Sequence, residues 1–220
     1  MTHPTPPQSS PGSAGGTAGP VAGATGGVGA VEFWFDPVCP FTWRTARWLV
    51  DVAGRRGIPI SWRPMSLGVL NSGSVAAEPD SPLAESAAAL RALVSAEDDA
   101  GQEAVAKLYT LLGTRKHDAG EPMTVDAIRD AARDAGLSPA VADAADDPAL
   151  DARIVASHQA GQDRAGMETG SPVLSLDGGK GYFGPVLTDV PLGDDADRLF
   201  DAVVLLASVG SFSELKTSRS

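Results

Sequence analysis

The sequence predicts an α/β fold in which a strand, a helix and a second strand come first, a long helical block follows, and a β-hairpin and a helix end the chain. Three observations support this prediction. Residues 31–35 and 58–62 alternate between apolar and other side chains, as strands do. Residues 67–166 have the apolar spacing of helices. Strand character returns at residues 171–183.

The opening strand, helix and strand are expected to form a βαβ unit. The helix should begin at Pro40, because the missing N–H of a proline would have no partner in the first helical turn anyway. Apolar residues then recur at helical spacing at Ala46, Leu49, Val50 and Ala53. Gly57 and Pro59 end the helix, and a right-handed crossover leads into the strand that contains Ile60 and Trp62.

Five helices are expected in the helical block. Apolar spacing marks the first at residues 83–96 and the second at Val105, Leu108, Tyr109 and Leu112. Thr124 is a favourable N-cap for a third helix, because its hydroxyl can accept a hydrogen bond from a free backbone N–H. The pairs Ser138-Pro139 and Asp147-Pro148 are typical starts of two more helices.

The end of the chain predicts a hairpin and a helix. Residues 171–176 and 181–183 have strand character, and Asp177-Gly178-Gly179 between them is a typical turn sequence. A final helix should follow, because a set of apolar residues there lies on one helical face: Ala196, Leu199, Phe200, Val203 and Ala207.

Composition limits the class of protein. The chain has 220 residues, of which 43% are hydrophobic, so it can bury a core and form one or two domains. Its net charge of −11 argues against a nucleic-acid partner, because phosphate binding normally needs a basic face. No apolar run approaches the roughly 18 residues of a membrane helix, so no membrane partner is expected. The sequence also contains no metal-ligand spacing and no glycine-rich phosphate loop, so neither a metal nor a nucleotide is expected.

Residues 1–29 form a separate predicted region. They are rich in Gly, Pro and Ala and contain no Lys, Arg, Asp or Glu, which predicts a disordered tail. Gly and Pro interrupt every short apolar run there, so no secretory signal is expected, and a single cysteine fits a reducing cytoplasm. The predicted organisation is this tail, a βαβ part at 30–66, a helical insertion at 67–166, and a hairpin with a helix at 167–220.

Cys39 is the residue on which the functional prediction depends most. It lies between the first strand and the first helix, so its sulfur should face unpaired N–H groups and the positive end of the helix dipole. Both favour the thiolate, which is the nucleophilic form. We therefore expect a reactive sulfur at an accessible rim. The alternative is that Cys39 only fills space in the core, as free cysteines often do.

Two motifs and the order of elements resemble the DsbA-like thiol oxidoreductases, which have a thioredoxin fold with an inserted helical domain. These motifs are Cys39-Pro40-Phe41-Thr42 and Gly170-Ser171-Pro172. The chain also resembles an actinobacterial branch, the mycothiol-dependent nitroreductases. Residues spread over almost all of 31–219 carry this closer resemblance: Phe33-Trp34-Phe35-Asp36-Pro37, Met65-Ser66-Leu67, Leu70-Asn71, Ser157-His158, Ala160-Gly161, Phe183-Gly184-Pro185-Val186-Leu187, and Phe212 with Glu214-Leu215-Lys216.

The resemblance implies roles for particular residues. Members of the branch carry a second cysteine at the place of Thr42, which resolves the mixed disulfide at the first, so this chain cannot run a two-cysteine cycle. We expect Thr42 instead to donate a hydrogen bond to the Cys39 sulfur and to stabilise the thiolate. Pro172 is implied to be a cis proline opposite Cys39, which lets Ser171 offer its N–H and C=O to a substrate. Pro40 completes the candidate catalytic motif.

Aromatic side chains are the next candidates. Trp34, Phe41, Trp43 and Trp48 could together floor a pocket for a flat substrate, although core packing explains Trp48 at least as well. The resemblance alone suggests that Phe183 lines the site. We therefore place Phe41, Trp43 and Phe183 with Ser171 and Pro172 as substrate-binding or thiol-binding candidates.

The three histidines are weaker candidates. His117 and His158 could transfer protons or contact a thiol, but a solvated or structural role is favoured for both. His3 lies in the predicted tail. No catalytic role is therefore assigned to a histidine.

We predict a cytoplasmic thiol-dependent oxidoreductase with Cys39 as its nucleophile. The resemblance implies a low-molecular-weight thiol such as mycothiol as the reductant, and a mixed disulfide or a nitro compound as the acceptor. One alternative is a kappa-type glutathione transferase or isomerase, in which a hydroxyl at the helix start activates a bound thiol. Another is a binding protein that kept the fold after losing the resolving cysteine. Whether two chains form a homodimer stays open.

Overall fold

A computed structural model describes residues 27–79 and 81–218. It contains a four-stranded sheet and seven α-helices among these residues. In chain order the elements are β1 (Val31–Phe35), α1 (Pro40–Arg56), β2 (Ile60–Pro64), α2 (Leu67–Ser72), α3 (Pro82–Gly113), η1 (Thr114–Asp118), α4 (Val125–Asp134), α5 (Pro139–Asp143), η2 (Ala144–Asp146), η3 (Pro148–Leu150), α6 (Asp151–Ala165), β3 (Val173–Leu176), β4 (Gly181–Phe183) and α7 (Gly193–Ser208).

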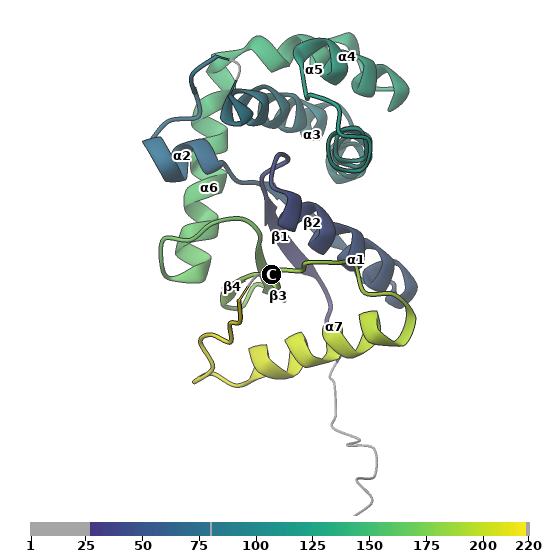
Figure 1. Ribbon diagram of the computed structural model, residues 1–220, viewed down its shortest axis with the longest axis vertical. Helices are drawn as coiled ribbons and strands as arrows, with labels where there is room; N and C mark the ends of the chain where they lie inside the picture. Colours follow the sequence, from purple (N-terminus) through teal and green to yellow (C-terminus); the bar gives the residue numbers. More distant parts are fainter. Residues whose placement is uncertain (1–26, 80, 219–220) are drawn as a thin grey trace, which may run out of the picture.

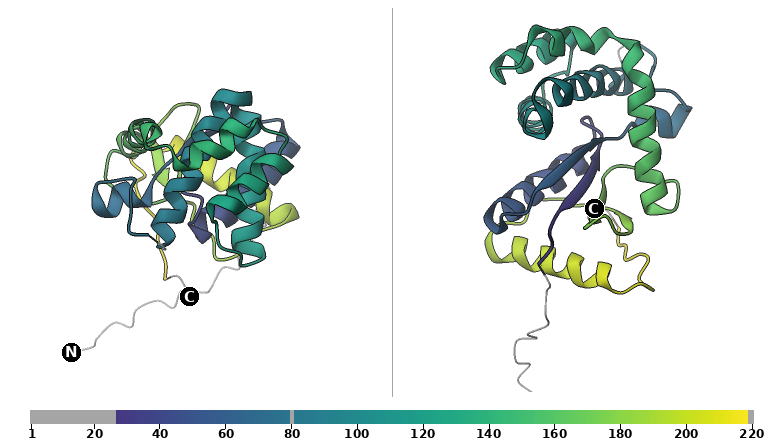
Figure 2. Two further views of the ribbon diagram at one scale, coloured as in Figure 1. Left: turned by 90° about the horizontal axis from the view of Figure 1, so that it is seen from above. Right: turned by 180° about the vertical axis from the view of Figure 1, so that it is seen from behind.

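The sheet lies near one end of the molecule and the helical block forms the other end. Figures 1 and 2 show α7 running along one end, next to the sheet and α1, while α4 and α5 lie at the opposite end above α3. The helices α2 to α6 come between β2 and β3 in the chain. The α/β fold with a helical insertion is therefore confirmed.

The predicted βαβ unit is present. β1 pairs in parallel with β2, and Val31 lies opposite Ile60 in the register. Pro40 occupies the first turn of α1, and Gly57 ends the helix with a left-handed φ of 67° while its N–H bonds to the carbonyl oxygens of Ala53 and Gly54. The local signals in the sequence therefore fixed both ends of α1.

The hairpin extends the sheet in the order β2-β1-β3-β4. β3 is antiparallel to both β1 and β4. The turn uses Asp177 and Gly178, both with positive φ, and the Asp177 carboxylate accepts hydrogen bonds from the N–H groups of Gly29 and Ala30 at 2.8 and 2.9 Å. The strand begins at Val173 rather than at Ser171, so Ser171 is left in the loop that faces Cys39.

The five helices predicted for the helical block correspond to four in the structure, and α2 was not predicted. The first two expected helices run together as α3, which is interrupted by non-helical angles at Ala100 and Gly101. Thr124 caps α4 by accepting the Ala127 N–H at 3.2 Å, as expected. Ser138 precedes α5 without any side-chain cap bond. Asp147-Pro148 opens only a 3-10 turn, after which α6 begins.

Aromatic side chains join the sheet to α3. Tyr109 of α3 lies 4.2 Å from Phe35 and 5.6 Å from Trp62, measured between ring centroids. Phe33 packs edge-on against Trp62 at 5.7 Å. All four rings are buried, and burying rings of this size contributes strongly to stability. The helical block is thus attached to the sheet through this cluster.

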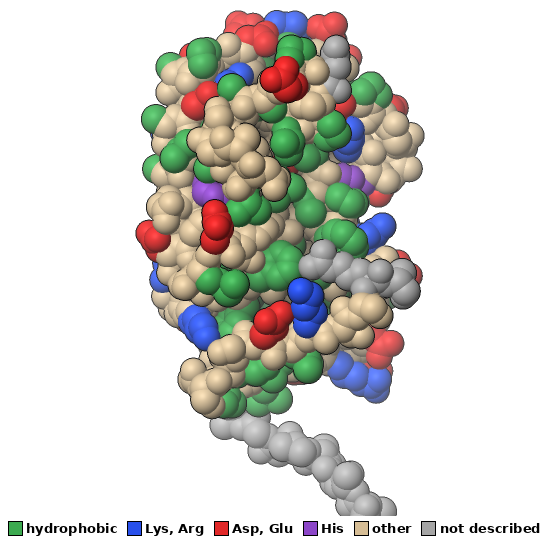
Figure 3. All heavy atoms as spheres, turned by 60° about the vertical axis from the view of Figure 1, so that its left-hand side comes forward, with side chains coloured by type: hydrophobic (Ala, Val, Ile, Leu, Met, Phe, Trp, Pro, Cys, Tyr) green, Lys and Arg blue, Asp and Glu red, His purple; other side chains and the backbone are tan. Residues whose placement is uncertain are grey.

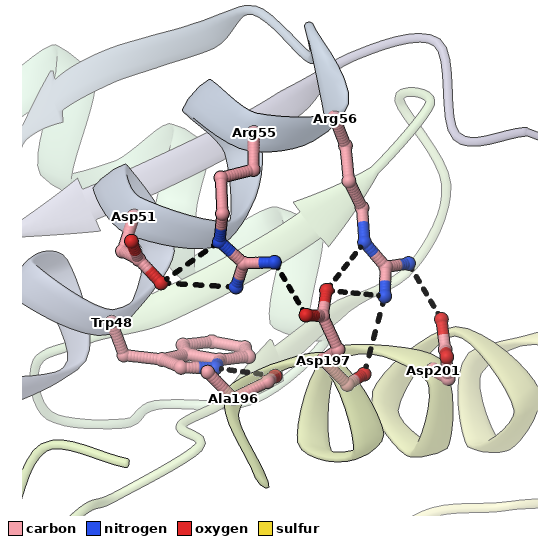
Figure 4. Close-up of polar contacts among 7 residues, drawn as sticks. All are labelled: Trp48, Asp51, Arg55, Arg56, Ala196, Asp197 and Asp201. Atoms are coloured by element: carbon pink, nitrogen blue, oxygen red, sulfur yellow. Dashed lines mark hydrogen bonds and ion pairs between the residues drawn. The ribbon is translucent and has the colours of Figure 1, made fainter. Parts of the chain in front are cut away.

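α7 docks on α1 through one buried contact and one exposed ion-pair network. The Trp48 indole N–H donates to the Ala196 carbonyl oxygen at 3.0 Å, and its ring lies 6.1 Å from that of Phe200. Arg55 and Arg56 reach across to the acids of α7, as Figure 4 shows. The predicted apolar face of the last helix therefore meets α1, with Ala196 and Phe200 fully covered.

The predicted tail and the predicted absence of a membrane-spanning helix concern different parts of the chain. The tail predicted at residues 1–29 falls largely on residues 1–26, which lie outside the described residues together with His3. Within the described part, none of the helices combines the length and the apolar character that crossing a bilayer requires.

One face, brought forward in Figure 3, carries apolar side chains across its middle and charged side chains mostly above and below them.

Candidate active site around Cys39

Cys39 is the N-cap residue of α1. Its backbone is extended, with φ −80° and ψ 116°, and its carbonyl oxygen accepts the Trp43 N–H at 3.1 Å. The Cys39 side chain makes no cap hydrogen bond to the N–H groups of the first turn of α1, so the expected contact between the sulfur and these groups is not seen. The prediction of a sulfur at an accessible rim is wrong, because Cys39 is buried with 8% of its surface exposed and its sulfur faces Ser171.

The Cys39 sulfur faces the loop before β3. Its thiol donates to the Ser171 carbonyl oxygen at 3.6 Å. The Ser171–Pro172 peptide bond is cis, which confirms the prediction for Pro172. The Cys39 sulfur thus lies between the start of α1 and the cis-proline loop.

Thr42 does not bond to the sulfur, so the predicted hydrogen bond from its hydroxyl to Cys39 is wrong. The Thr42 Oγ1 atom lies 2.7 Å from the Ser171 Oγ atom, and both residues are buried. The physical reason is that Thr42 points toward the cis-proline loop, where Ser171 offers a hydroxyl at ideal distance. Thr42 therefore contacts the residue that holds the sulfur, not the sulfur itself.

Asp36 is a site residue that the sequence interpretation missed. Its carboxylate accepts hydrogen bonds from the Val38 N–H at 3.0 Å and the Leu67 N–H at 2.7 Å. The Ser86 hydroxyl also contacts both carboxylate oxygens at 2.8 Å. The Asp36 N–H donates to Ser171 Oγ at 2.8 Å. The Asp36 side chain thus connects the Cys39 loop to α2 and α3, and its backbone N–H connects it to the cis-proline loop.

Burial controls the titration of Asp36. The residue has no exposed surface, and loss of hydration raises the pKa of its carboxyl from 3.8 to about 6. The hydrogen bonds from Leu67, Val38 and Ser86 act in the opposite direction but do not cancel the effect of burial. An acid placed directly after an apolar strand and shortly before Cys39 was the available signal in the sequence.

The segment after β4 supports the cis-proline loop. The Gly184 N–H donates to the Pro172 carbonyl oxygen at 2.9 Å, and the Gly184–Pro185 bond is a second cis bond that was not predicted. The Thr45 hydroxyl of α1 donates to the Pro185 carbonyl oxygen at 2.7 Å. Phe183 is 40% exposed, and its ring lies near Gly170. These contacts bring Phe183 to the same loop as Ser171 and Pro172.

The four aromatic residues proposed as one floor do not come together. Trp34 packs with Met65 and Val173 in a separate cluster and donates its indole N–H to the Ser157 carbonyl oxygen. Trp48 belongs to the core under α7, in agreement with the packing alternative. Only Phe41 and Trp43 stay beside Cys39, because they lie in the first turn of α1.

Trp43 and His117 form a flat wall next to the Cys39 loop. Their rings stack with centroids 5.8 Å apart and 25° between the planes. The His117 Nε2 atom lies 2.8 Å from the Pro37 carbonyl oxygen, which is in the loop that carries Cys39. Burial lowers the pKa of His117, which fits the structural role that was favoured for it. Trp43 and Pro40 line a pocket of about 260 Å³ on this side.

His158 lies away from this wall, on α6. It is 5% exposed, and its Nε2 atom is 3.2 Å from the Gln162 amide nitrogen. Burial lowers its pKa as well. Gln162 also bonds to the backbone of Thr169 in both directions, at 2.6 and 2.8 Å. His158 therefore belongs to the packing behind the cis-proline loop.

Metal ligands are not grouped in the described part of the chain. No set of three or more His, Cys, Asp or Glu side chains among residues 27–79 and 81–218 lies close enough together to hold a metal ion.

Sequence comparisons place the chain beside a known family. The family described as Rv2466c-like, mycothiol-dependent nitroreductase Rv2466c, matches residues 38–217. The Mycobacterium tuberculosis (strain ATCC 25618 / H37Rv) protein named "Uncharacterized protein Rv2286c" is 33% identical over 195 residues, which cover 86% of this chain and 82% of that protein. Both similarities extend over most of the chain.

Structural comparisons identify the same fold. A 2-hydroxychromene-2-carboxylate isomerase structure is 15% identical with a TM-score of 0.59, and covers 82% of this chain and 95% of its own. The cytosolic disulfide reductase DsbM from Pseudomonas aeruginosa with GSH is 17% identical with a TM-score of 0.54, and covers 80% and 100%. The probable DsbA oxidoreductase SCO1869 from Streptomyces coelicolor is 19% identical with a TM-score of 0.54, and covers 86% and 93%. At these identities the similarity shows the thioredoxin-like fold of the DsbA type.

Proposed function

Because the chain belongs to the Rv2466c-like family of mycothiol-dependent nitroreductases, we propose that it is a thiol-dependent oxidoreductase that works with a single cysteine, Cys39. The small thiol is mycothiol or a thiol like it, and the acceptor is a disulfide or another reducible electrophile. The observation that carries the proposal is the position of the Cys39 sulfur, at the start of α1 and opposite the cis Ser171–Pro172 bond.

The absence of a second cysteine determines the cycle. Cys39 is the chain's one cysteine, so no disulfide can form within one chain. In the first step the Cys39 thiolate attacks a disulfide R–S–S–R′, a Cys39–S–S–R bond forms, and R′ leaves as a thiolate. In the second step a free thiolate R″–S⁻ attacks the R sulfur, R–S–S–R″ leaves, and the Cys39 thiolate returns. Each step breaks one S–S bond and forms another, so electrons balance.

The same Cys39 thiol can also reduce a nitro compound. Two thiols that become one disulfide supply two electrons and two protons, which convert a nitro group to a nitroso group and water. In this chain one of those thiols is Cys39 and the other is the small thiol. The mixed disulfide that results is then released by a second small thiol, as in the second step of the disulfide cycle.

Substrate docking provides a way to free the thiol. The Ser171 carbonyl oxygen accepts the Cys39 S–H when no substrate is bound. An amide N–H of a substrate placed along the cis-proline loop competes for the same oxygen. Occupation of the carbonyl then removes the hydrogen bond that the thiol makes and leaves the sulfur free to react with the bound substrate. Ser171 thus links binding to activation.

The isomerase or transferase alternative receives less support. That mechanism needs a hydroxyl at the start of the helix that is free to activate a bound thiol. The Thr42 side chain is fully buried, and its oxygen already lies 2.7 Å from Ser171 Oγ. Because the hydroxyl already has a partner, Cys39 remains the better candidate for direct chemistry.

The test is a turnover assay with purified protein. The substrate is a mixed disulfide of mycothiol and a fluorescent thiol, free mycothiol is the second thiol, and release of the fluorescent thiol is followed. We expect saturable turnover for the natural chain and none above the uncatalysed rate for Cys39→Ser. Turnover that survives in Cys39→Ser would favour the isomerase or transferase alternative. Binding of mycothiol without turnover in either protein would favour a binding protein.

A further inference from the structure

A pocket opens beside the first turns of α1, which Cys39 caps. Its volume is about 260 Å³, and its wall includes Pro40, Trp43, Arg44, Arg47, His117 and Asp118. Pro40 directly follows Cys39, and His117 contacts the carbonyl oxygen of Pro37 in the Cys39 loop at 2.8 Å. A group bound in this pocket would therefore lie next to the chain segment that carries the sulfur.

The two arginines of this pocket differ from all others that the structure describes. Within residues 27–79 and 81–218, every arginine except Arg44 and Arg47 has a carboxylate oxygen within ion-pair distance. A protein with a net charge of −11 has many acids available for such pairs. The two arginines that have none lie one helical turn apart on α1 and line the same pocket.

Aromatic rings, rather than acids, hold these two side chains. The Arg47 guanidinium lies 4.1 Å from the centre of the Trp43 ring, and that of Arg44 lies 5.6 Å from the Phe41 ring. Arg47 also donates to Thr110 Oγ1 at 3.3 Å. Its Nε atom is buried and has no hydrogen-bond partner among the described residues. Burial of a charged donor without an acceptor costs stability unless a ligand supplies the acceptor.

The acids near the pocket are already engaged. Asp118 Oδ1 accepts the Trp43 indole N–H at 2.9 Å. Asp189 is exposed, and its Oδ1 atom accepts the Val190 N–H at 2.8 Å. Neither carboxylate lies within ion-pair distance of Arg44 or Arg47. The guanidinium groups thus retain donors for an anion from outside the protein.

We propose that this pocket binds a carboxylate of the acceptor substrate, so that Arg44 and Arg47 select acceptors that carry a carboxylate close to their reactive bond. The inference rests on the proposed function, because it concerns the substrate of Cys39. Arg47 forms the inner contact and Arg44 the outer one, and Trp43 with His117 supplies a flat surface for the body of the substrate. Carboxylate binding by two guanidinium groups also orients the acceptor relative to the sulfur.

The experiment compares two aromatic disulfides that differ in charge. Dithiobis(nitrobenzoate) carries a carboxylate on each ring, and dithiodipyridine carries none. Each reacts with the Cys39 thiolate to give a mixed disulfide and one aromatic thiolate, whose absorbance reports the rate. For Arg47→Gln we expect the rate with dithiobis(nitrobenzoate) to fall about tenfold, since a hydrogen bond to a charged group contributes about that factor. The rate with dithiodipyridine should stay within about twofold. Arg44→Gln should act in the same direction with a smaller factor.

Two further variants control this comparison. Arg47→Lys keeps the positive charge and should recover part of the selectivity, which separates charge from packing against Trp43. Arg198→Gln removes an exposed arginine of α7 and should change neither rate, which excludes an effect of net charge.

The possible results lead to different conclusions. Equal losses with both probes in Arg47→Gln would show a structural role for Arg47 and would overturn the inference, as would unchanged rates with both. If neither probe modifies Cys39 in the natural chain, the proposed function fails and the inference fails with it. If both probes modify Cys39 but no variant alters their ratio, only the inference fails.

Discussion

The two sides of Cys39 differ in whether their polar side chains have hydrogen-bond or ion-pair partners. On the side of the cis-proline loop, Asp36, Thr42 and Ser171 are buried, and each hydrogen-bonds to another of the three or to nearby backbone. On the side of η1, Arg44 and Arg47 have no carboxylate within ion-pair distance among the described residues, and Arg47 Nε is buried without a partner. The first side is a network in which each polar group has a hydrogen-bond partner, and it positions the sulfur. The second side has arginine N–H groups without a partner in the described part of the chain, which suits it to bind a ligand.

The largest expected effect on stability is at Gly113 of α3, which packs against the Trp43 ring of the arginine pocket. A Cβ atom there would lie 2.1 Å from the Trp43 ring, which is buried. We expect Gly113→Ala to lower the free energy of unfolding by about 3 kcal/mol and to disturb the pocket. Urea unfolding measures the first effect. The charge selectivity between the two aromatic disulfides measures the second.

Gly54 of α1 is a matched control for Gly113. A Cβ atom on Gly54 would have no neighbour within 4 Å, and the residue is exposed in the same helix as Trp43. Gly54→Ala should therefore raise stability by about 0.5–1 kcal/mol. Equal stability of both variants would contradict the close contact between α3 and the Trp43 ring.

An effect of about the same size is expected at Asp36, which lies on the cis-proline side of Cys39. Its carboxyl has a pKa of about 6 when folded and 3.8 when hydrated, so the folded state binds more protons between these values. Stability therefore falls as the pH rises through this window, by about 3 kcal/mol at 1.36 kcal/mol per pKa unit. Asp36→Asn should lack this fall. The measurement is the free energy of unfolding of both proteins from pH 4 to 7.

Asp195 provides the control for the pH experiment. It lies in the first turn of α7 with 75% of its side chain exposed, and its partner is the equally exposed Arg198. Asp195→Asn should leave the pH dependence of the natural chain unchanged. If Asp36→Asn and the natural chain showed parallel pH profiles, the buried carboxyl would not be the group that titrates.

A smaller effect is expected from the hydroxyl pair. Ser171→Ala removes the acceptor of the Asp36 N–H and the partner of Thr42, so we expect a loss of about 1–3 kcal/mol. Thr42→Val removes one partner only and should cost about 1 kcal/mol. Because the two residues share a hydrogen bond, the double variant should lose less than the sum of the two. Additive losses would show that the two hydroxyls act independently.

The smallest effect is expected far from both sides, at the exposed ion pairs between α1 and α7 (Figure 4). Asp197→Asn breaks its pairs with Arg55 and Arg56, but exposed pairs of this kind contribute little because water and salt screen them. The rates of Cys39 with both aromatic disulfides should not change. A changed ratio between the two probes would mean that charge selectivity comes from the whole surface rather than from the pocket.

Sequence reasoning succeeded where the signal is local or carried by a motif. The start of α1 at Pro40 and its end at Gly57 follow from residue types within one helical turn. The cis bond before Pro172 was implied by the family motif and is present. These features do not depend on which distant segment packs against them, so they could be predicted from the chain alone.

Sequence reasoning failed where distant segments decide the outcome. Thr42 and Ser171 are 129 positions apart, and the direction of the Thr42 hydroxyl depends on their meeting. The carboxylate of Asp36 is enclosed by Leu67 and Ser86, which belong to the helical insertion. The lack of a carboxylate within ion-pair distance of Arg47 among the described residues is likewise a property of the assembled pocket. None of these contacts has a spacing in the sequence that would reveal it.

The most direct test of the central claim is mass spectrometry of the intact protein in a single turnover. The protein is incubated with the disulfide of mycothiol, the excess is removed, and mycothiol is then added. The account predicts one mycothiol adduct per chain, located on Cys39, which disappears when the second thiol is added. A chain that gains no adduct, or an adduct that the second thiol does not release, would contradict a cycle carried by this one sulfur.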